Sequence, residues 1–387
     1  MEGRIEMNFI PYGKQWIDED DIKAVVEVLQ SDYLTTGPKI AEFESSLKKV
    51  TGAKNALAIS NGTAALHCAI NILDLKEGDE VITSPITFAA SANSSLYYGV
   101  KPIFADIDMN TYNINPEQVE KKITELTKAI VAVDFTGQPC DYDSLRKIAD
   151  KHNLVLIADA AHSLGATYKG KRVGEIADIT TMSFHPVKLI TSGEGGAILT
   201  NNDNFHKKAE LFRSHGITRN KELMIDKEAG DWYYEMISLG YNYRLTDIQC
   251  ALGISQLNKL KKFLARRREI AKKYDEAFSK LDYVITPKQL DGTNSAWHLY
   301  ILKFKLKELG KTRREIFDFL KSKNVGVNVH YIPVYKLPYY QKLGYKDFQC
   351  PNAEEYYETA ITIPLFPKMT DEEVAYVIEQ VKKVDEV

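Results

Sequence analysis

What the sequence lacks excludes several classes of protein. None of its apolar runs approaches the ~18 residues that a bilayer-spanning helix needs, so we expect no membrane among its partners. Its 50 basic and 53 acidic residues leave a net charge of −3. That balance argues against a generally basic surface for nucleic acid, although it does not exclude a local basic patch. We therefore expect no nucleic-acid partner.

Cysteine is scarce: the four cysteines, Cys68, Cys140, Cys250 and Cys350, lie far apart. No two of them have the close spacing of a zinc site, so we expect no metal. Separated cysteines are typical of reduced thiols in a cytoplasm. The first residues, Met-Glu-Gly-Arg-Ile-Glu-Met, are acidic and polar and do not resemble a signal peptide. Together these features predict a cytoplasmic protein.

Two nucleotide-binding motifs are also missing. No segment reads G-x-x-x-x-G-K-[ST], and no G-x-G-x-x-G follows the first expected strand. Nucleotide hydrolysis and NAD binding therefore lose support. The chain of 387 residues is nevertheless long enough for a large domain with a smaller one.

Short apolar segments alternate with amphipathic helices in the first half of the chain. We expect strands at 56–59, 80–83, 102–105, 129–133 and 154–159, and a pair of strands around the loop at 184–196. This alternation predicts an α/β domain with a mostly parallel, mixed sheet flanked by helices. A helix from Asp18 has apolar residues at helical spacing, at Ile22, Val25, Val26 and Leu29.

The second half of the chain has a different rhythm. The segment 217–243 has no clear period and reads as a long loop. Thr246 and Gln249 form a capping box that starts a long helix, and strands at 283–286, 299–304 and 325–330 follow it. We expect an N-terminal segment and large domain at 1–245, a linking helix at 246–282 and a small α+β domain at 283–387.

Lys188 is the residue that the rest of the site is built around. It lies between apolar runs, before the turn Gly-Glu-Gly-Gly, and a desolvated lysine amine becomes a usable nucleophile near neutral pH. The same stretch alone also fits a surface lysine on an ordinary loop. Asp159 ends an apolar strand, where ligands of open α/β sheets gather, although it also fits a cap or a turn.

Three other positions could bind parts of a cofactor. Gly62 and Thr63 open a helix directly after a strand, where free N–H groups bind phosphate or simply cap the helix. Phe88 lies at another strand-to-helix turn and either stacks on a planar cofactor or packs in the core. With Ser183, Asp159 and Lys188 they supply what pyridoxal 5′-phosphate (PLP) needs: a phosphate site, a stacking ring, an acid and an amine.

The chain resembles the DegT/DnrJ/EryC1/StrS family of sugar aminotransferases. This resemblance implies the PLP-dependent transferase fold type I, and it extends from Leu34 to Leu365. It rests on segments that include 34–38, 61–66, 87–90, 134–139, 159–162, 183–188, 193–196, 213–216, 240–244, 329–333 and 363–365. Some relatives carry histidine in place of the lysine and dehydrate sugars, so Lys188 favours transamination.

The resemblance implies roles by position. Lys188 would bind PLP covalently and act as the catalytic residue, Asp159 would pair with the pyridine nitrogen, and His162 would lie near the ring hydroxyl. Phe88 and Ala161 would cover the two ring faces. Gly62, Thr63 and Ser183 would bind the phosphate together with Asn242 of a partner subunit, which implies a homodimer with shared active sites. The substrate-binding residues would be Tyr12, Tyr33, Leu34, Thr35, His185, Asn242, Arg244, His330 and Tyr331.

Within the family, the chain looks most like the members that act in pseudaminic acid biosynthesis. The substrates implied are L-glutamate and a UDP-linked 4-keto-6-deoxy-N-acetyl sugar, aminated at C4 to UDP-4-amino-4,6-dideoxy-N-acetyl-β-L-altrosamine. One alternative is the same chemistry on another nucleotide 4-keto sugar, of the legionaminic acid or bacillosamine type. A non-enzymatic PLP-binding regulator is the alternative of another class. The sequence disfavours it, because such regulators usually carry a DNA-binding extension and no helix-turn-helix precedes the first expected helix.

Overall fold

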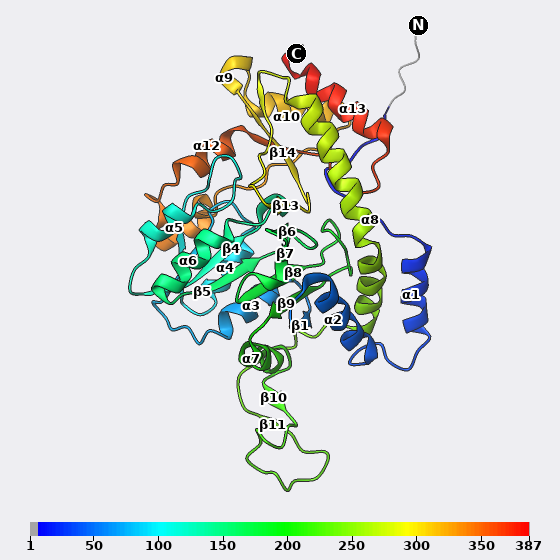
Figure 1. Cartoon of the computed structure of the whole chain (residues 1–387), viewed down its shortest axis with the longest axis vertical. Helices are drawn as coiled ribbons and strands as arrows, with labels where there is room; N and C mark the ends of the chain where they lie inside the picture. The colour runs from blue at the N-terminus through cyan, green and yellow to red at the C-terminus, as the bar shows by residue number, and fades with distance from the viewer. Residues whose placement is uncertain (1–6, 387) are drawn as a thin grey trace.

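The computed structural model describes residues 7–386 and is built around one seven-stranded sheet (Figure 1). Across the sheet the strands run β1 (Asn55–Ile59), β9 (Gly196–Thr200), β8 (Ile179–Ser183), β5 (Val155–Asp159), β4 (Thr127–Val133), β2 (Glu80–Thr83) and β3 (Lys101–Phe104). β9 pairs antiparallel with both of its neighbours, and every other pairing is parallel. The predicted mostly parallel, mixed sheet of fold type I is confirmed.

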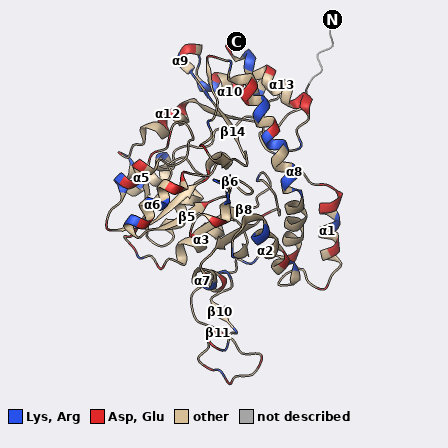
Figure 2. Ribbon diagram, in the orientation of Figure 1, with Lys and Arg blue, Asp and Glu red and all other residues tan. Residues whose placement is uncertain are grey.

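Helices flank this sheet, namely α2 (Pro38–Thr51), α3 (Gly62–Asn71), α4 (Ala90–Leu96), α5 (Pro116–Lys122), α6 (Tyr142–His152) and α7 (Asp203–Arg213). Among them, α2, α5, α6 and α7 carry charges of both signs (Figure 2). The strands are almost entirely buried, as expected for a sheet covered on both faces. A further three-stranded sheet packs β13 (Thr293–Asn294), β6 (Thr167–Tyr168) and β7 (Lys171–Arg172) together.

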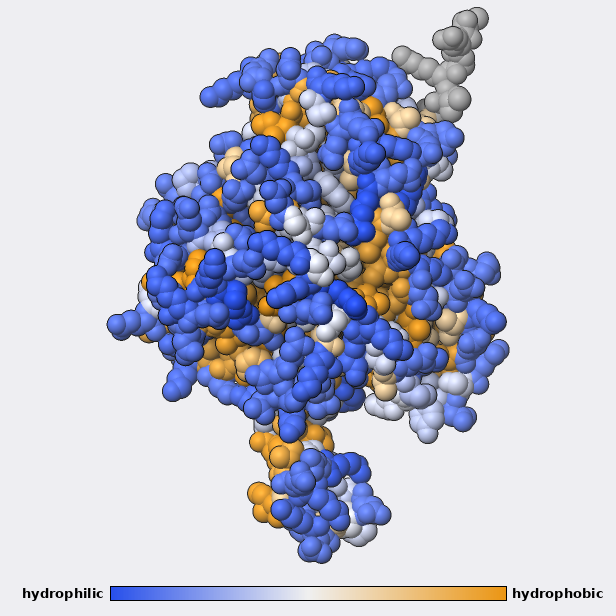
Figure 3. Space-filling view, viewed as in Figure 1, coloured by the Kyte–Doolittle hydropathy of each residue, from blue (hydrophilic) through white to orange (hydrophobic). Residues whose placement is uncertain are grey.

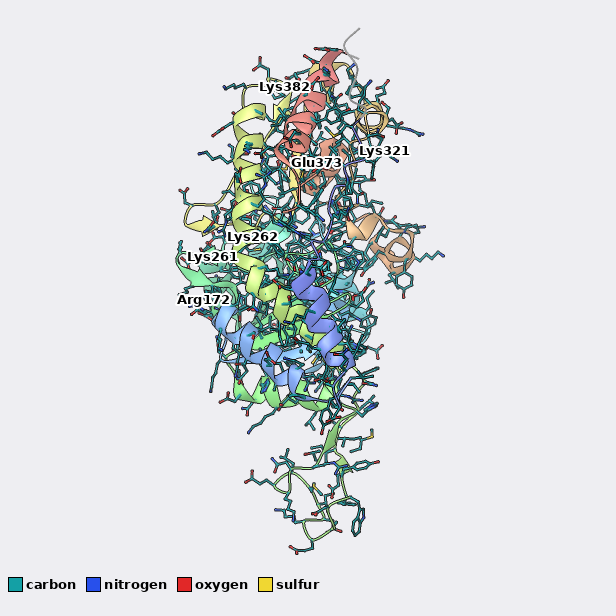
Figure 4. All side chains as sticks on the ribbon, turned by 90° about the vertical axis from the view of Figure 1, so that its right-hand side faces the viewer. Arg172, Lys261, Lys262, Lys321, Glu373 and Lys382 are labelled. Carbon is teal, nitrogen blue, oxygen red and sulfur yellow. The ribbon has the colours of Figure 1, made fainter. Side chains whose placement is uncertain are left out.

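Helix α8 (Asp247–Phe278) begins at the capping box expected from Thr246 and Gln249 and runs from beside α1 (Glu19–Leu29) and α2 up to α13 (Asp371–Lys382), as the yellow-green helix in Figure 4. Beyond it a small sheet contains β12 (Val284–Ile285), β14 (Tyr300–Phe304) and β15 (Ala360–Ile363). The helices of this part are α9 (Leu306–Leu309), α10 (Arg313–Ser322), α11 (Pro338–Tyr340), α12 (Pro351–Thr359) and α13 (Asp371–Lys382). Its core joins one side of α8 to α10, α13 and the small sheet. The division of the chain at 245 and 282 stays a prediction.

Two local expectations were wrong. The strand expected at 325–330 is reduced, within residues 7–386, to isolated bridges from Val325 to Ile10 and from Asn328 to Thr362. The segment 217–243 is not a plain loop, because β10 (Ile217–Thr218) and β11 (Glu235–Met236) pair in an arm that projects from the molecule (Figure 1).

Helix α1 (Glu19–Leu29) has the apolar spacing expected from the sequence, but this stripe does not face the core. Ile22 and Leu29 are instead about half exposed, at 49% and 55%, while Asp21 is fully buried. The reason is a polar contact with α8: Asp21 accepts hydrogen bonds from Ser255 Oγ and Gln256 Nε2, at 2.6 and 2.8 Å, and an ion pair from Lys259. Polar contacts with α8, together with the buried Val28, orient this helix.

No helix among the described residues combines the length and the apolar character that a membrane crossing needs. Apolar surface is visible at several places in Figure 3, one of which is the arm at the bottom of the view. Ile225 and Trp232 are 92% and 81% exposed there, and Leu239 is 73% exposed. Isolated exposed apolar residues are ordinary, but a contiguous group of them marks a contact surface.

We predict that Asp247→Ala destabilises the fold by disconnecting α2 from α8. The Asp247 carboxylate is fully buried and accepts hydrogen bonds from the N–H groups of Gly37 and Lys39, at 2.8 and 2.9 Å. Leaving such donors unpaired lowers the free energy of unfolding by about 1–3 kcal/mol, which urea unfolding measures. The control Asp347→Ala removes an exposed carboxylate and should change it by about 0.5 kcal/mol or less. Equal effects of the two variants would contradict the prediction.

Candidate active site

A cavity of about 810 Å³ opens at the carboxyl ends of the central strands. The sheet supplies Asp159, the last residue of β5, and Ser183, the last residue of β8. Parallel strands bring their carboxyl ends to one edge, which is where open α/β sheets bind ligands. Residues from the two ends of the chain, Tyr12 and His330, line the same cavity.

Many of the residues expected at the site line this cavity, and the others do not. Those that line it are Tyr12, Gly62, Thr63, Phe88, Asp159, Ala161, His162, Ser183, His185, Lys188, His330 and Tyr331. Those outside it are Tyr33, Leu34, Thr35, Asn242 and Arg244. Tyr33 and Leu34 are about half exposed, at 56% and 48%, so a single chain does not bring them to the ligand.

Lys188 is held by a short loop between β8 and β9. The loop is closed by hydrogen bonds from Phe184 N to Gly195 O and from Ser192 N to Phe184 O, at 2.8 and 3.0 Å. The next two residues, Leu189 and Ile190, are buried and anchor the backbone of Lys188 in the core. The amine therefore has a defined position at the cavity wall.

The cavity tunes the charge of its titratable groups. Burial lowers the pKa of Lys188 to about 8, against a partial compensation by the nearby Asp159 carboxylate. Burial raises the pKa of Asp159, while hydrogen bonds from Ser91 Oγ and the Ala161 N–H and the charge of Lys188 oppose the rise. A lysine whose pKa is near neutrality is partly present as the neutral amine, which can accept a proton.

Two histidines of the cavity stay neutral. Burial lowers the pKa of His162 well below its ordinary value, and the charge of Lys188 lowers it further. Burial and Lys188 also lower the pKa of His330, to about 3. The ring of His330 is oriented by a hydrogen bond between its Nδ1 and Thr362 Oγ1, at 2.8 Å. Both imidazoles can thus donate or accept one hydrogen bond without carrying charge.

The start of α3 has the features of an anion site. The Asn61 side chain caps the helix by accepting from Ala64 N at 2.8 Å, and no acceptor within residues 7–386 pairs with the N–H groups of Gly62 and Thr63. A Cβ at Gly62 would lie 2.9 Å from the Ser183 Cβ, so only glycine permits this approach. Two free N–H groups beside a serine hydroxyl, at the positive end of a helix, suit a phosphate.

The residues present fit PLP. His162 Nδ1 is buried in the cavity without a hydrogen-bond partner in the described part of the chain, which a ligand hydroxyl would supply. Lys188 offers the amine, Asp159 the acid and the start of α3 the phosphate site. Phe88 is 63% exposed although it lines the cavity, so its face is available for a planar ring. These assignments remain predictions of role.

Reasoning from the sequence missed several lining residues, among them Ser91, Thr181, Glu194, Tyr243 and Asn328. Ser91 has the clearest connection to the chemistry, because its hydroxyl donates to Asp159 Oδ2 at 2.6 Å. The one signal in the sequence was its position four residues after Thr87, which puts the two hydroxyls on one side of a helical turn.

Comparison with known proteins agrees with this geometry. The profile of the DegT/DnrJ/EryC1/StrS aminotransferase family matches residues 15–382. The spore coat polysaccharide biosynthesis protein SpsC of Bacillus subtilis is 42% identical over 97% of each chain. The UDP-4-amino-4,6-dideoxy-N-acetyl-beta-L-altrosamine transaminase of Campylobacter jejuni is 41% identical over 97% of this chain and 99% of its own. The Helicobacter pylori PseC structure, an aminotransferase of pseudoaminic acid biosynthesis, superposes with a TM-score of 0.92 at 35% identity, covering 98% and 100% of the two chains.

We predict that Lys188 in the cofactor-free protein reacts as an amine of unusually low basicity. Its rate of reductive methylation, followed by peptide mass spectrometry, should rise with pH up to about 8 and then level off. Exposed lysines of ordinary pKa, ~10.4, should continue to gain reactivity above that pH. In Asp159→Asn the plateau should begin at lower pH, because the carboxylate that raises the pKa of Lys188 is gone. A Lys188 profile that follows the exposed lysines would contradict the prediction.

Proposed function

Because the chain belongs to the DegT/DnrJ/EryC1/StrS aminotransferase family, we propose a specific reaction for it: transfer of the amino group of L-glutamate to C4 of a UDP-4-keto-6-deoxy-N-acetyl sugar. The product would be UDP-4-amino-4,6-dideoxy-N-acetyl-β-L-altrosamine. The chain is a PLP-dependent sugar aminotransferase, and the choice of substrate is the proposal. One observation carries the aminotransferase chemistry: a low-pKa lysine, a buried acid and a free helix start line one cavity.

The residues divide the work as their chemistry dictates. PLP, when bound, supplies an aldehyde carbon that takes up the amino group and a ring that accepts an electron pair. Lys188 Nζ, neutral near its pKa of about 8, takes a proton from Cα of the amino donor and later delivers one to C4 of the sugar. Asp159 keeps the ring nitrogen protonated. His162 binds the ring hydroxyl, and Gly62, Thr63 and Ser183 bind the phosphate.

The substrates of this reaction are strongly anionic, and the cavity of one chain offers little positive charge. Among the described residues that line it, Lys188 is the only lysine or arginine, and Asp159 and Glu194 are acidic. A UDP diphosphate and the glutamate carboxylates therefore need cations from outside this lining. We propose that a second copy completes the site and brings Asn242 to the phosphate, and that Tyr33, Leu34, Thr35 and Arg244 reach the substrate in the same assembly. The exposed apolar residues of the arm and of α1 support such a homodimer.

The identity of the sugar is supported by the Campylobacter and Helicobacter relatives. The Bacillus relative, 42% identical, is named as a spore coat polysaccharide biosynthesis protein, so a different nucleotide 4-keto sugar is the second candidate. Rates on UDP-4-keto sugars of L and D configuration separate the two. We place the reaction in the cytoplasm, which the four separated cysteines favour.

We predict that Lys188→Ala abolishes turnover and preserves the cavity. Loss of a positioned acid–base group costs ~10²–10⁴-fold, and loss of the amine that binds PLP adds to this. The measurement is formation of 2-oxoglutarate from L-glutamate in the presence of the 4-keto sugar. Retained binding of pyridoxamine phosphate serves as the control for an intact fold. Turnover close to that of the unmodified enzyme would overturn the assignment of Lys188.

Shared active sites predict an unusual complementation. Lys188→Ala and Asn242→Asp chains, each inactive as homodimers, should form active heterodimers on co-expression, because one of the two sites then has both native residues. Heterodimers of wild-type chain with the Lys188→Ala/Asn242→Asp double variant should be inactive, since each site has lost one residue. Separate tags allow both heterodimers to be purified for the assay. If each site belongs to one chain, the two results are reversed.

A further inference from the structure

Two hydroxyl groups of the cavity form a series of hydrogen bonds that ends at Asp159. Thr87 Oγ1 lies 2.7 Å from Ser91 Oγ, and Ser91 Oγ lies 2.6 Å from Asp159 Oδ2. All three side chains are buried, with exposed fractions of 3%, 1% and 5%. Hydrogen bonds between groups shielded from water are stronger than in solvent, and a buried polar group left unpaired costs free energy.

The chemistry of the three groups determines which of them donates in each hydrogen bond. An ionised carboxylate only accepts hydrogen bonds, so Ser91 must donate its single hydroxyl hydrogen to Asp159. The oxygen of Ser91 is then left to accept, and Thr87 becomes its donor. If Asp159 were protonated, the hydrogen of Ser91 could turn to the carbonyl of Phe88, which lies at the longer distance of 3.3 Å. The 2.6 Å separation is typical of a hydroxyl that donates to a carboxylate.

The two oxygens of Asp159 are not equivalent. Oδ2 is taken by Ser91, whereas Oδ1 accepts only a long bond of 3.3 Å from the N–H of Ala161. We propose that Ser91, oriented by Thr87, is a positioning residue that holds Asp159 as a carboxylate and leaves Oδ1 to pair with the ring nitrogen of PLP. This inference rests on the proposed function, because it takes Asp159 as the partner of that nitrogen.

Ser91 would affect the position of the proton that the ring nitrogen shares with Asp159. Burial raises the pKa of Asp159, and the hydrogen bond from Ser91 is the largest of the effects that oppose the rise. Without Ser91 the carboxylate would bind a proton more strongly and draw it away from the ring. Other charged or titratable groups near Asp159 are Lys188, whose charge favours the carboxylate, and Asp134, Tyr142 and Tyr331. Ser91 is the hydroxyl in direct contact.

Helix α4 offers a matched control. Ser94 is as deeply buried as Ser91, and its hydroxyl donates to the carbonyl of Ser91 at 2.9 Å. Ser94→Ala thus removes the same atom from the same helix without touching Asp159. Thr87→Val keeps the shape of Thr87 and removes only the donor to Ser91.

The test is the ¹⁵N chemical shift of PLP labelled at the ring nitrogen, bound in the holoenzyme, with Asp159→Asn as the reference for a nitrogen that has lost its partner. In Ser91→Ala we expect the shift to move from the wild-type value toward the Asp159→Asn value, while Ser94→Ala stays at the wild-type value. Dialysis should also give a roughly tenfold or greater loss of pyridoxamine phosphate affinity in Ser91→Ala, the size expected for a hydrogen bond to a charged group.

Each other outcome has a definite meaning. A wild-type shift in Ser91→Ala, with a displaced shift in Asp159→Asn, would overturn the inference and leave the proposed function intact. A wild-type shift in Asp159→Asn would overturn the role of Asp159 itself. If Ser91→Ala fails to fold, Thr87→Val decides: a smaller displacement in the same direction supports the inference, and no displacement overturns it.

Discussion

The antiparallel pairing of β8 with β9 is the constraint on which the site depends. Ser183 lies opposite Gly196, so the loop between the two strands starts and ends at one point of the sheet. A loop closed in this way has few conformations, and its buried residues fix the one that points Lys188 into the cavity. A Cβ at Gly196 would lie 2.6 Å from the backbone of Asn61, so this glycine lets the start of α3 approach the same place. The pairing of β8 with β9 therefore positions both the amine of Lys188 and the start of α3.

Burial then determines the chemistry, because it acts in opposite directions on acids and bases. It makes the Lys188 amine less basic and the Asp159 carboxyl less acidic, and it keeps His162 and His330 neutral. Left alone, it would neutralise the carboxylate that PLP chemistry needs. Hydrogen bonds to Asp159 are the means by which the fold opposes that effect at one residue without adding solvent.

The cavity also requires parts of the chain that are far apart in sequence. The backbone of Ile10 bonds to Asn324 and Gly326, and Leu365 N donates to Tyr12 O at 3.1 Å. These contacts bring Tyr12 and the segment that contains His330 and Tyr331 to the mouth of the cavity. The N-terminal segment thus packs on the C-terminal core although the sequence division assigned it to the large domain.

Local chemistry alone determined much of this protein. The capping box at Thr246 starts a helix where expected, since a cap involves residues only three positions apart, and capping boxes at Thr312 and Thr370 start two more helices. The buried strands and the loop of Lys188 were predictable for the same reason. Tertiary structure decided the rest. Whether Ile22 or Asp21 faces inward depends on the partners that α8 presents, and the contact of Ser91 with Asp159 joins residues 68 positions apart. A pattern along the chain cannot specify such contacts, because their energy arises only when the folded sheet brings both groups out of water together.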